Sequence, residues 1–191
     1  MTDPRAIFEA VFSHMCGQGR CFVVEGLPLP LCQRCLGLYL GAGLALLWLA
    51  ATRPWRRGFP PLPVLALHAA ALLMALAGGL HWLDLGPRWR FLCGLLTGYV
   101  LAHWFVLGAL ALRRPKTGTV TNFRKRVTVP VFRDLCPLGS LIVLALSPWP
   151  AGLPGAWWAI SLAAVLSAAA LYLTAVVAVT ALALRLLARP D

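Results

Sequence analysis

Residues 156–184 decide the fold, and they read AWWAISLAAVLSAAALYLTAVVAVTALAL. This run contains no charged residue, no proline and no glycine. A helix needs roughly 20 apolar residues to cross about 30 Å of hydrocarbon. Because the run is longer than that, we expect the helix to tilt or to extend into the interface. The run therefore predicts a transmembrane helix in the last part of the chain.

Further apolar runs precede it at about residues 36–51, 62–83 and 91–112, with a weaker one at 135–147. The weaker run is short for a span unless its helix starts near Pro130, a residue that suits the first turn of a helix. A re-entrant segment is the alternative. We therefore predict an all-α, polytopic transmembrane bundle of about five spans, or four if residues 135–147 are re-entrant.

The composition agrees with a membrane protein. Of 191 residues, 60% are hydrophobic and 12% are charged, whereas soluble domains carry about 25% charged residues. The formal net charge is +11, and the basic residues lie between the apolar runs. That placement suits topology signals and anionic lipid head groups. No motif supports a nucleic-acid partner, so we expect the bilayer as partner, with membership of a larger membrane complex as a further option.

The basic residues also predict an orientation. With five spans, one side carries Arg53, Arg56, Arg57, Arg113, Arg114, Lys116, Arg124, Lys125, Arg126, Arg133, Arg185 and Arg189. The other side carries Arg5, Arg20, Arg34, Arg88 and Arg90. This asymmetry predicts an N-terminus outside and a C-terminus in the cytoplasm of a prokaryotic cell membrane. A re-entrant fourth segment would move the C-terminus to the other side.

The chain divides into a Cys-rich segment, residues 1–35, and a helical bundle, residues 36–191. In the first segment, residues 4–15 fit a short amphipathic helix, and glycines and prolines then break the chain. Cys16, Cys21, Cys32 and Cys35 follow the spacing C-x4-C-x10-C-x2-C, and His14 is an alternative ligand. Two cysteine pairs of this kind complete a tetrahedral zinc site. A metal contributing on the order of 10 kcal/mol would order a segment that has little core of its own.

Two other states of the cysteines remain open. Facing an oxidising compartment, they would form structural disulfides. Alternatively, Cys32 and Cys35 form a redox-active C-x-x-C pair with Arg34 lowering a thiol pKa. Cys16 and Cys21 would then shuttle electrons, as in quinone-linked disulfide-forming oxidases. The sequence leaves open whether the chain is an enzyme.

The cysteine motif resembles a family of small prokaryotic membrane proteins, domain-of-unknown-function family 2085. The resemblance rests on Cys16-Gly17-Gln18, on Arg20-Cys21-Phe22 and on Pro30-Leu31-Cys32-Gln33-Arg34-Cys35-Leu36-Gly37-Leu38-Tyr39-Leu40-Gly41, with a looser match at Asp84, Arg90 and Thr97-Gly98. It covers about residues 12–105. It implies a membrane location and an N-terminal site, and it implies no reaction.

This chain departs from the family pattern at two positions. Gly17 stands where the family has His, and Cys21 stands where it has Ser. One possible ligand is lost and another is gained nearby. The exchange suits a site of three cysteines and one histidine that has become a site of four cysteines.

Other residues are candidates for chemistry in the bundle. His81, Asp84 and Cys93 are expected at the same face as Cys32 and Cys35, where they would form a polar mouth. His68 and His103 lie inside predicted spans, both about 9 to 14 Å from the opposite face at 1.5 Å per residue. Two intramembrane histidines at similar depth suit haem binding or proton relay, although hydrogen-bonded packing is the simpler interpretation.

Small residues also predict how two spans pack. Gly37 and Gly41 lie four apart in the first span, as Gly94 and Gly98 do in the third. This spacing lets helix backbones approach closely. The sequence thus indicates a membrane protein with a zinc-binding, structural or accessory N-terminal site. A thiol–disulfide oxidoreductase and a haem-binding subunit are the alternatives.

Overall fold

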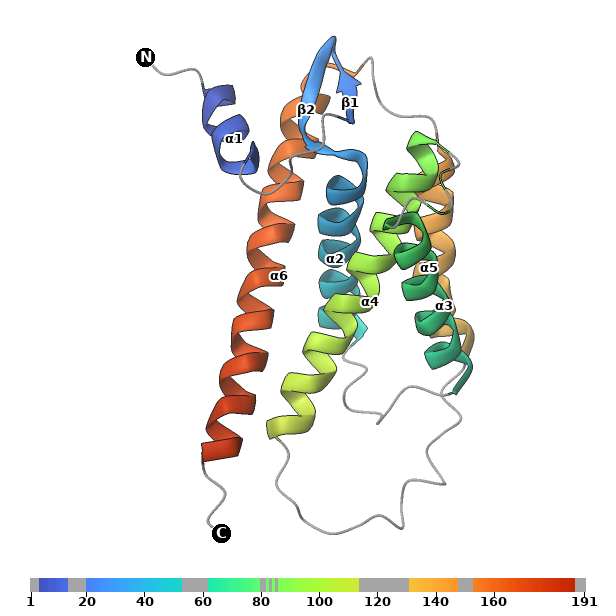
Figure 1. Ribbon diagram of the computed structural model, residues 1–191, viewed down its shortest axis with the longest axis vertical. Coiled ribbons are helices and arrows are strands. Elements are labelled where there is room, and N and C mark those ends of the chain that lie inside the picture. The colour runs from blue at the N-terminus through green and yellow to red at the C-terminus, as the bar shows by residue number, and fades with distance from the viewer. Residues whose placement is uncertain are drawn as a thin grey trace.

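The computed structural model describes residues 4–13, 20–52, 62–79, 82, 84, 86–113, 131–147 and 153–187. Its elements are α1 (Pro4–Ser13), β1 (Cys21–Val24), β2 (Leu27–Cys32), α2 (Gln33–Thr52), α3 (Leu62–Gly79), α4 (Pro87–Arg113), α5 (Val131–Leu146) and α6 (Ala156–Leu187). Figure 1 shows the helices α2 to α6 side by side, with the β1–β2 hairpin at one end of the bundle. The predicted all-α membrane fold is confirmed, and the hairpin is an addition that the sequence did not predict.

Three helices are long and apolar enough to cross a membrane. They cover Gln33–Thr52, Pro87–Ala109 and Ala156–Leu184, which correspond to the first, third and last predicted spans. The helices α3 and α5 are shorter, at 18 and 16 residues. The helix α5 begins at Val131, directly after Pro130, so it includes Arg133 and Asp134 before the fourth apolar run. In Figure 1, α2, α4 and α6 all begin at the hairpin end and finish at the opposite end.

The closest helix pair is α2 with α4, and glycines on both helices make it possible. A Cβ atom added at Gly37 or Gly41 would collide with the backbone oxygen of Phe91 or Leu95. A Cβ atom added at Gly94 or Gly98 would meet backbone atoms of α2 in the same way. The predicted close approach of the two glycine pairs is therefore confirmed, and each pair contacts the partner backbone directly.

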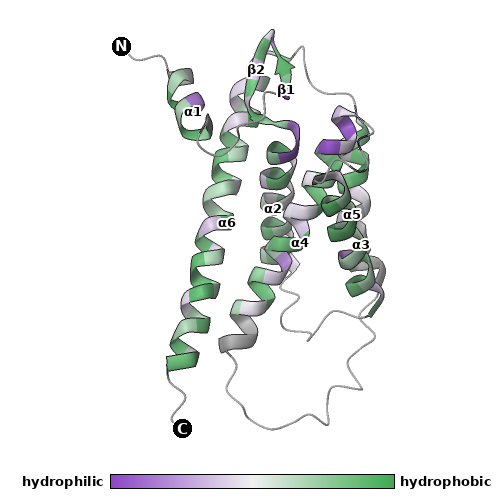
Figure 2. Cartoon of the chain, in the orientation of Figure 1, coloured by the Kyte–Doolittle hydropathy of each residue, from purple (hydrophilic) through white to green (hydrophobic). Residues whose placement is uncertain are grey.

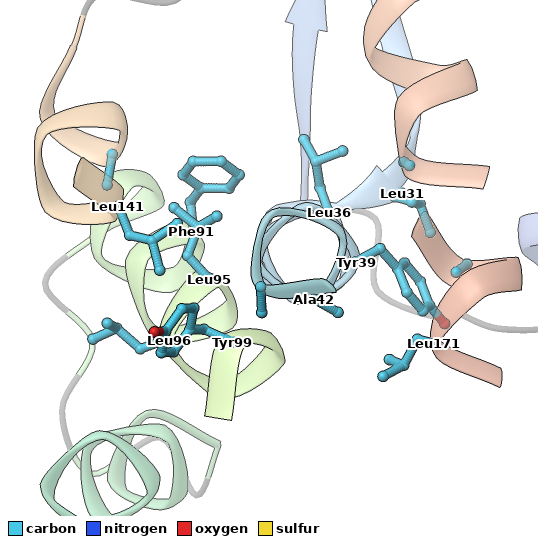
Figure 3. Packing of buried hydrophobic residues seen from close by; sticks show 14 of the residues in the cluster. Leu31, Leu36, Tyr39, Ala42, Phe91, Leu95, Leu96, Tyr99, Leu141 and Leu171 are labelled. Atoms are coloured by element: carbon cyan, nitrogen blue, oxygen red, sulfur yellow. The ribbon is translucent and has the colours of Figure 1, made fainter. Parts of the chain in front are cut away.

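The core surrounds this helix pair (Figure 3). Leu36 and Ala42 of α2 lie opposite Phe91 and Leu95 of α4, and all four are buried. On the other side of α2, Tyr39 faces Leu171 of α6. Figure 2 shows that the middle of the long helices is hydrophobic, whereas hydrophilic residues gather at the hairpin ends of α2 and α4. The bundle therefore positions one polar end beside the hairpin.

The hairpin forms around a two-residue turn at Glu25 and Gly26. Both residues have positive φ angles, 54° and 74°, as a type I′ turn requires. Pro28 and Pro30 suggested a break in the chain, but a two-stranded sheet has only edge strands, where proline is tolerated. The carbonyl oxygen of Pro28 accepts a hydrogen bond of 3.0 Å from Trp157 Nε1. That bond ties β2 to the start of α6.

The first helix, α1, packs on the same end of the bundle. Phe8 makes edge-to-face contacts with the rings of Trp157 and Trp158, and Phe12 is buried near Tyr39. Ile7 and Val11 on α1 are exposed. The amphipathic helix predicted for residues 4–15 is present over Pro4–Ser13, with one apolar side on the bundle and further apolar residues left for a membrane interface.

Candidate functional site at the hairpin end

The hairpin and the start of α2 bring three of the predicted cysteines to one end of the bundle. Cys21 begins β1 and is the antiparallel partner of Cys32, the last residue of β2. Cys35 lies in the first turn of α2. Its backbone N–H donates a hydrogen bond of 3.5 Å to Cys32 Sγ. The fold thus brings Cys21 and Cys35, the first and last residues of the stretch 21–35, next to Cys32.

Cys32 occupies a position that favours a negatively charged sulfur. It directly precedes α2 and therefore caps a helix N-terminus, where unpaired backbone N–H groups and the helix dipole stabilise anions. Cys32 is 3% exposed, whereas Cys21 and Cys35 are half-buried. Burial of Cys32 suits a ligand or a structural thiol better than a freely accessible nucleophile, because reactive cysteines are usually partly exposed.

The remaining predicted ligands lie outside the described residues. These are Cys16 and His14, which the zinc prediction needs for a fourth ligand. Within the part of the chain that the structure describes, no group of three or more His, Cys, Asp and Glu residues is close enough to hold a metal ion. Cys21, Cys32 and Cys35 are therefore not grouped closely enough in this structure to hold a metal ion together, and the zinc site, which also needs Cys16 or His14, stays a prediction.

A polar network lies beside the cysteines and joins four segments. Arg90 of α4 donates to Asp84, with Nε 2.9 Å from Oδ1 and Nη2 2.5 Å from Oδ2. Arg90 Nη1 also donates to Gln33 Oε1 at 3.2 Å. Arg20 lies just before β1, and its Nη1 atom is 3.5 Å from Asp84 Oδ2. The carbonyl oxygen of Arg20 accepts a 3.0 Å hydrogen bond from the backbone N–H of Gln33.

This network fixes the charge of Asp84. The hydrogen bond from Arg90 holds the pKa of the Asp84 carboxyl below its ordinary value of 3.8, and the backbone N–H of Gly86 and the charges of Arg90 and Arg20 lower it further, against a smaller opposing effect of desolvation. Asp84 is therefore ionised at neutral pH. It anchors two arginines between the hairpin and α4.

The predicted polar mouth is only partly present as expected. Asp84 lies at the hairpin end, as predicted. Cys93 is buried within the bundle, with its Sγ 3.9 Å from the carbonyl oxygen of Met74, and His81 is outside the described residues. Sequence reasoning missed Arg20 and Gln33, whose role depends on a hairpin that it did not predict. The signal that could have found them is the pair of turn residues Glu25 and Gly26 between two apolar stretches.

Arg34 points from the cysteine motif into the bundle. Its Nη2 donates a hydrogen bond to the carbonyl oxygen of Gly78, near the end of α3. A cation that satisfies a C-terminal carbonyl also interacts favourably with the helix dipole. In the described residues its Nε atom is buried with no hydrogen-bond partner. Arg34 therefore links the C-x-x-C turn to α3, a role different from the thiol activation considered from sequence.

The two histidines that the sequence predicted inside spans, His68 and His103, meet between α3 and α4. The ring centroids of His68 and His103 are 5.3 Å apart, and the two side chains are 2% and 7% exposed. The ring of Tyr99 lies 5.0 Å from that of His103 and 6.1 Å from that of His68. Their predicted similar depth is thus matched by direct proximity, although haem binding itself is not tested by this arrangement. Cys136 lies in α5, but its side chain is not among those that the structure describes.

Comparison with known proteins relates part of the chain to a family of predicted membrane proteins. No curated protein and no solved structure matches the chain. A family model described as predicted membrane protein (DUF2085) matches residues 16–104, a range that includes the cysteines, the hairpin, the glycine pairs of α2 and α4, and the Asp84 network. The resemblance noted from the motif is therefore confirmed: residues 16–104, a little under half of the chain, match the DUF2085 family of predicted membrane proteins.

Proposed function

We propose that the hairpin end of this membrane protein carries a cysteine-ligated zinc site with a structural or accessory role. The observation that carries the proposal is the arrangement around Cys32. Cys21 is its partner across the hairpin, and the N–H of Cys35 contacts its sulfur. Zinc binds thiolates with Zn–S distances of about 2.3 Å, and the sulfur of a buried cysteine at a helix N-terminus is a suitable anionic ligand.

The site would add a cross-link to a hairpin that already packs on the bundle through the buried side chains of Val24, Leu29 and Leu31. The hairpin is only two strands, and an isolated two-stranded hairpin is marginally stable at best. Cys16 or His14 would supply the fourth ligand and thereby fix the segment between α1 and β1. Zinc would act here as a cross-link between that segment, the hairpin and the start of α2.

Metal analysis of the purified full-length chain tests the proposal. We expect about one zinc per chain, lost in Cys32→Ser and retained in Cys93→Ser. Cys93 is the matched control because it is also buried but lies in α4, against the carbonyl oxygen of Met74. A wild-type protein purified without chelators that contains no zinc, or a Cys32→Ser variant that keeps it, contradicts the proposal.

A second function is favoured by one feature of the same residues. Cys35 is half-buried and follows Cys32 by three positions, so the pair can form a disulfide or open it by exchange. In that exchange the partner's two thiols are oxidised to a disulfide as a Cys32–Cys35 disulfide is reduced to two thiols. A quinone would then accept two electrons and two protons from Cys32 and Cys35, which re-forms their disulfide and releases a quinol. Mass-resolved alkylation should then reveal a Cys32–Cys35 disulfide that responds to added quinone. Zinc without this response supports the first function alone.

A further inference from the structure

The hydrogen-bond pattern of the hairpin fixes the relation between Cys21 and Cys32. The two residues are antiparallel partners in neighbouring strands. The backbone N–H of Gln33 donates to the carbonyl oxygen of Arg20 at 3.0 Å, so Arg20 and Gln33 are the hydrogen-bonded pair next to them. Such pairs alternate with non-hydrogen-bonded pairs along an antiparallel ladder. Cys21 and Cys32 are therefore a non-hydrogen-bonded pair.

A pair of this kind has the spacing that a disulfide needs. In a non-hydrogen-bonded pair the Cα atoms lie about 4.5 Å apart, and the side chains are closer together than in the alternate pairs. A disulfide joins cysteines whose Cα atoms lie about 4.4–6.8 Å apart. The register of the hairpin thus allows Cys21 and Cys32 to be joined across the strands without moving the backbone.

The two sulfur atoms of this pair differ in access and in charge. Cys21 is half-buried, whereas Cys32 is 3% exposed. Cys32 directly precedes α2, and a helix N-terminus favours a thiolate. The backbone N–H of Cys35, 3.5 Å from Cys32 Sγ, supports the same charge. A reagent from solution therefore reaches Cys21 first, with the Cys32 thiolate held across the strands from it.

We propose that Cys21 and Cys32 form a reversible cross-strand disulfide by exchange with a small-molecule disulfide. In the first step the Cys21 thiolate attacks the external disulfide, which gives a mixed disulfide and one released thiol. In the second step the Cys32 thiolate attacks the sulfur of Cys21, and the other external thiol leaves. The two protons lost by the cysteines are taken up by the two released thiols. The external disulfide is thereby reduced as the cysteine pair is oxidised.

This disulfide would control the site at the hairpin end, because it withdraws two of the cysteines that the zinc proposal needs. That consequence rests on the proposed function. The pairing of Cys21 with Cys32 rests only on the register of the hairpin. The two can therefore be tested separately on the same protein.

Trypsin separates the possible disulfides, because Arg20 and Arg34 bracket the hairpin. Cleavage after these arginines places Cys21 and Cys32 together on peptide 21–34 and leaves the first cysteine of α2 on the next peptide. The full-length protein in detergent, stripped of metal with a chelator, is incubated with glutathione disulfide, alkylated and digested. We expect peptide 21–34 to carry no alkyl group and to be lighter by two hydrogen atoms. Prior reduction should restore two alkyl groups.

Variants identify the partner of Cys32. Cys35→Ser should form the same disulfide as readily as the wild type, whereas Cys21→Ser should leave peptide 21–34 without it. Two outcomes overturn the proposal. One is a peptide 21–34 that keeps both alkyl groups after incubation with glutathione disulfide, and the other is a peptide 21–34 that is cross-linked through Cys32 to another peptide.

Zinc measured in protein that has not been treated with chelator separates this proposal from the proposed function. We expect one zinc to be released for each Cys21–Cys32 disulfide that forms. Reduced protein that contains no zinc but still forms the disulfide contradicts the proposed function and supports the pairing. Zinc that stays bound after the disulfide has formed contradicts the control of the zinc site by this pair.

Discussion

At the scale of single residues, the Asp84 carboxylate is the charge that organises the hairpin end. Its pKa is lowered chiefly by the hydrogen bond from Arg90. A carboxyl whose pKa is lower in the folded state contributes stability above its ordinary value, here 3.8, and loses that contribution as the pH falls through the lower folded value. The bonds to Arg90 and Arg20 therefore stabilise the protein at neutral pH and not in strong acid.

We predict that Asp84→Asn lowers the melting temperature in detergent at neutral pH, and that the difference from wild type shrinks as the pH falls below the ordinary carboxyl pKa of 3.8. The asparagine keeps the size of the side chain and removes the charge that two arginines share. Glu9→Gln is the control, since Glu9 is an exposed carboxylate on α1 and should leave the melting temperature unchanged. If Asp84→Asn and the wild type have the same melting temperature at pH 7, the network of Asp84 with Arg90 and Arg20 does not stabilise the protein.

These residues also show where sequence reasoning stops. The cysteine spacing predicted a site at Cys21, Cys32 and Cys35, and the C-x2-C pair of Cys32 and Cys35 at a helix start is visible locally. A functional role of these cysteines stays a prediction. The contact of Arg20 with Asp84 was not predicted, because Asp84 lies 64 positions away along the chain. Only the folded hairpin brings the two side chains together. A long-range pair of this kind leaves no local pattern in one sequence.

At the scale of elements, the α2–α4 pair depends on the absence of side chains at four glycines. We predict that Gly41→Ala destabilises the protein by about 1–3 kcal/mol, the usual cost of overpacking a well-packed contact. The reason is that its Cβ would collide with the backbone of Leu95, which cannot move without separating the helices. Thermal unfolding in detergent measures the loss.

The matched control lies on the partner helix itself. Gly108→Ala in α4 places a Cβ where nothing lies within 4 Å, so it should be neutral or stabilise by up to about 1 kcal/mol through helix propensity. If Gly41→Ala and Gly108→Ala melt alike, the close approach of α2 and α4 does not limit stability.

The elements themselves were predictable to different degrees. The helices followed from apolar runs, since a membrane leaves the helix as one of few ways to satisfy the backbone. The hairpin was missed because Pro28 and Pro30 look like chain breakers, and their compatibility with an edge strand becomes visible only when a single partner strand is present. The start of α5 at Val131 matches the alternative, drawn from sequence, that this helix starts near Pro130.

At the scale of the whole molecule, the bundle has one polar end, beside the hairpin (Figure 2). Arg20, Arg34 and Arg90 lie at the hairpin end, whereas α2, α4 and α6 finish at the other end. Most of the 17 Lys and Arg residues belong to connections at that other end, if five segments cross. Basic connections stay in the cytoplasm, and they would also draw anionic lipids.

We therefore predict that a reporter inserted after Thr121 and a reporter at the C-terminus lie on the same side, the cytoplasm. Both α4 and α6 run away from the hairpin end, so their ends share a side whenever α5 crosses between them. A fluorescent protein, which matures only in the cytoplasm, should be bright at both positions, and alkaline phosphatase, which folds only outside, should be inactive at both. Opposite results at the two positions would mean that α5 is re-entrant, because a segment that returns to its own side leaves α6 to reverse the location of the C-terminus.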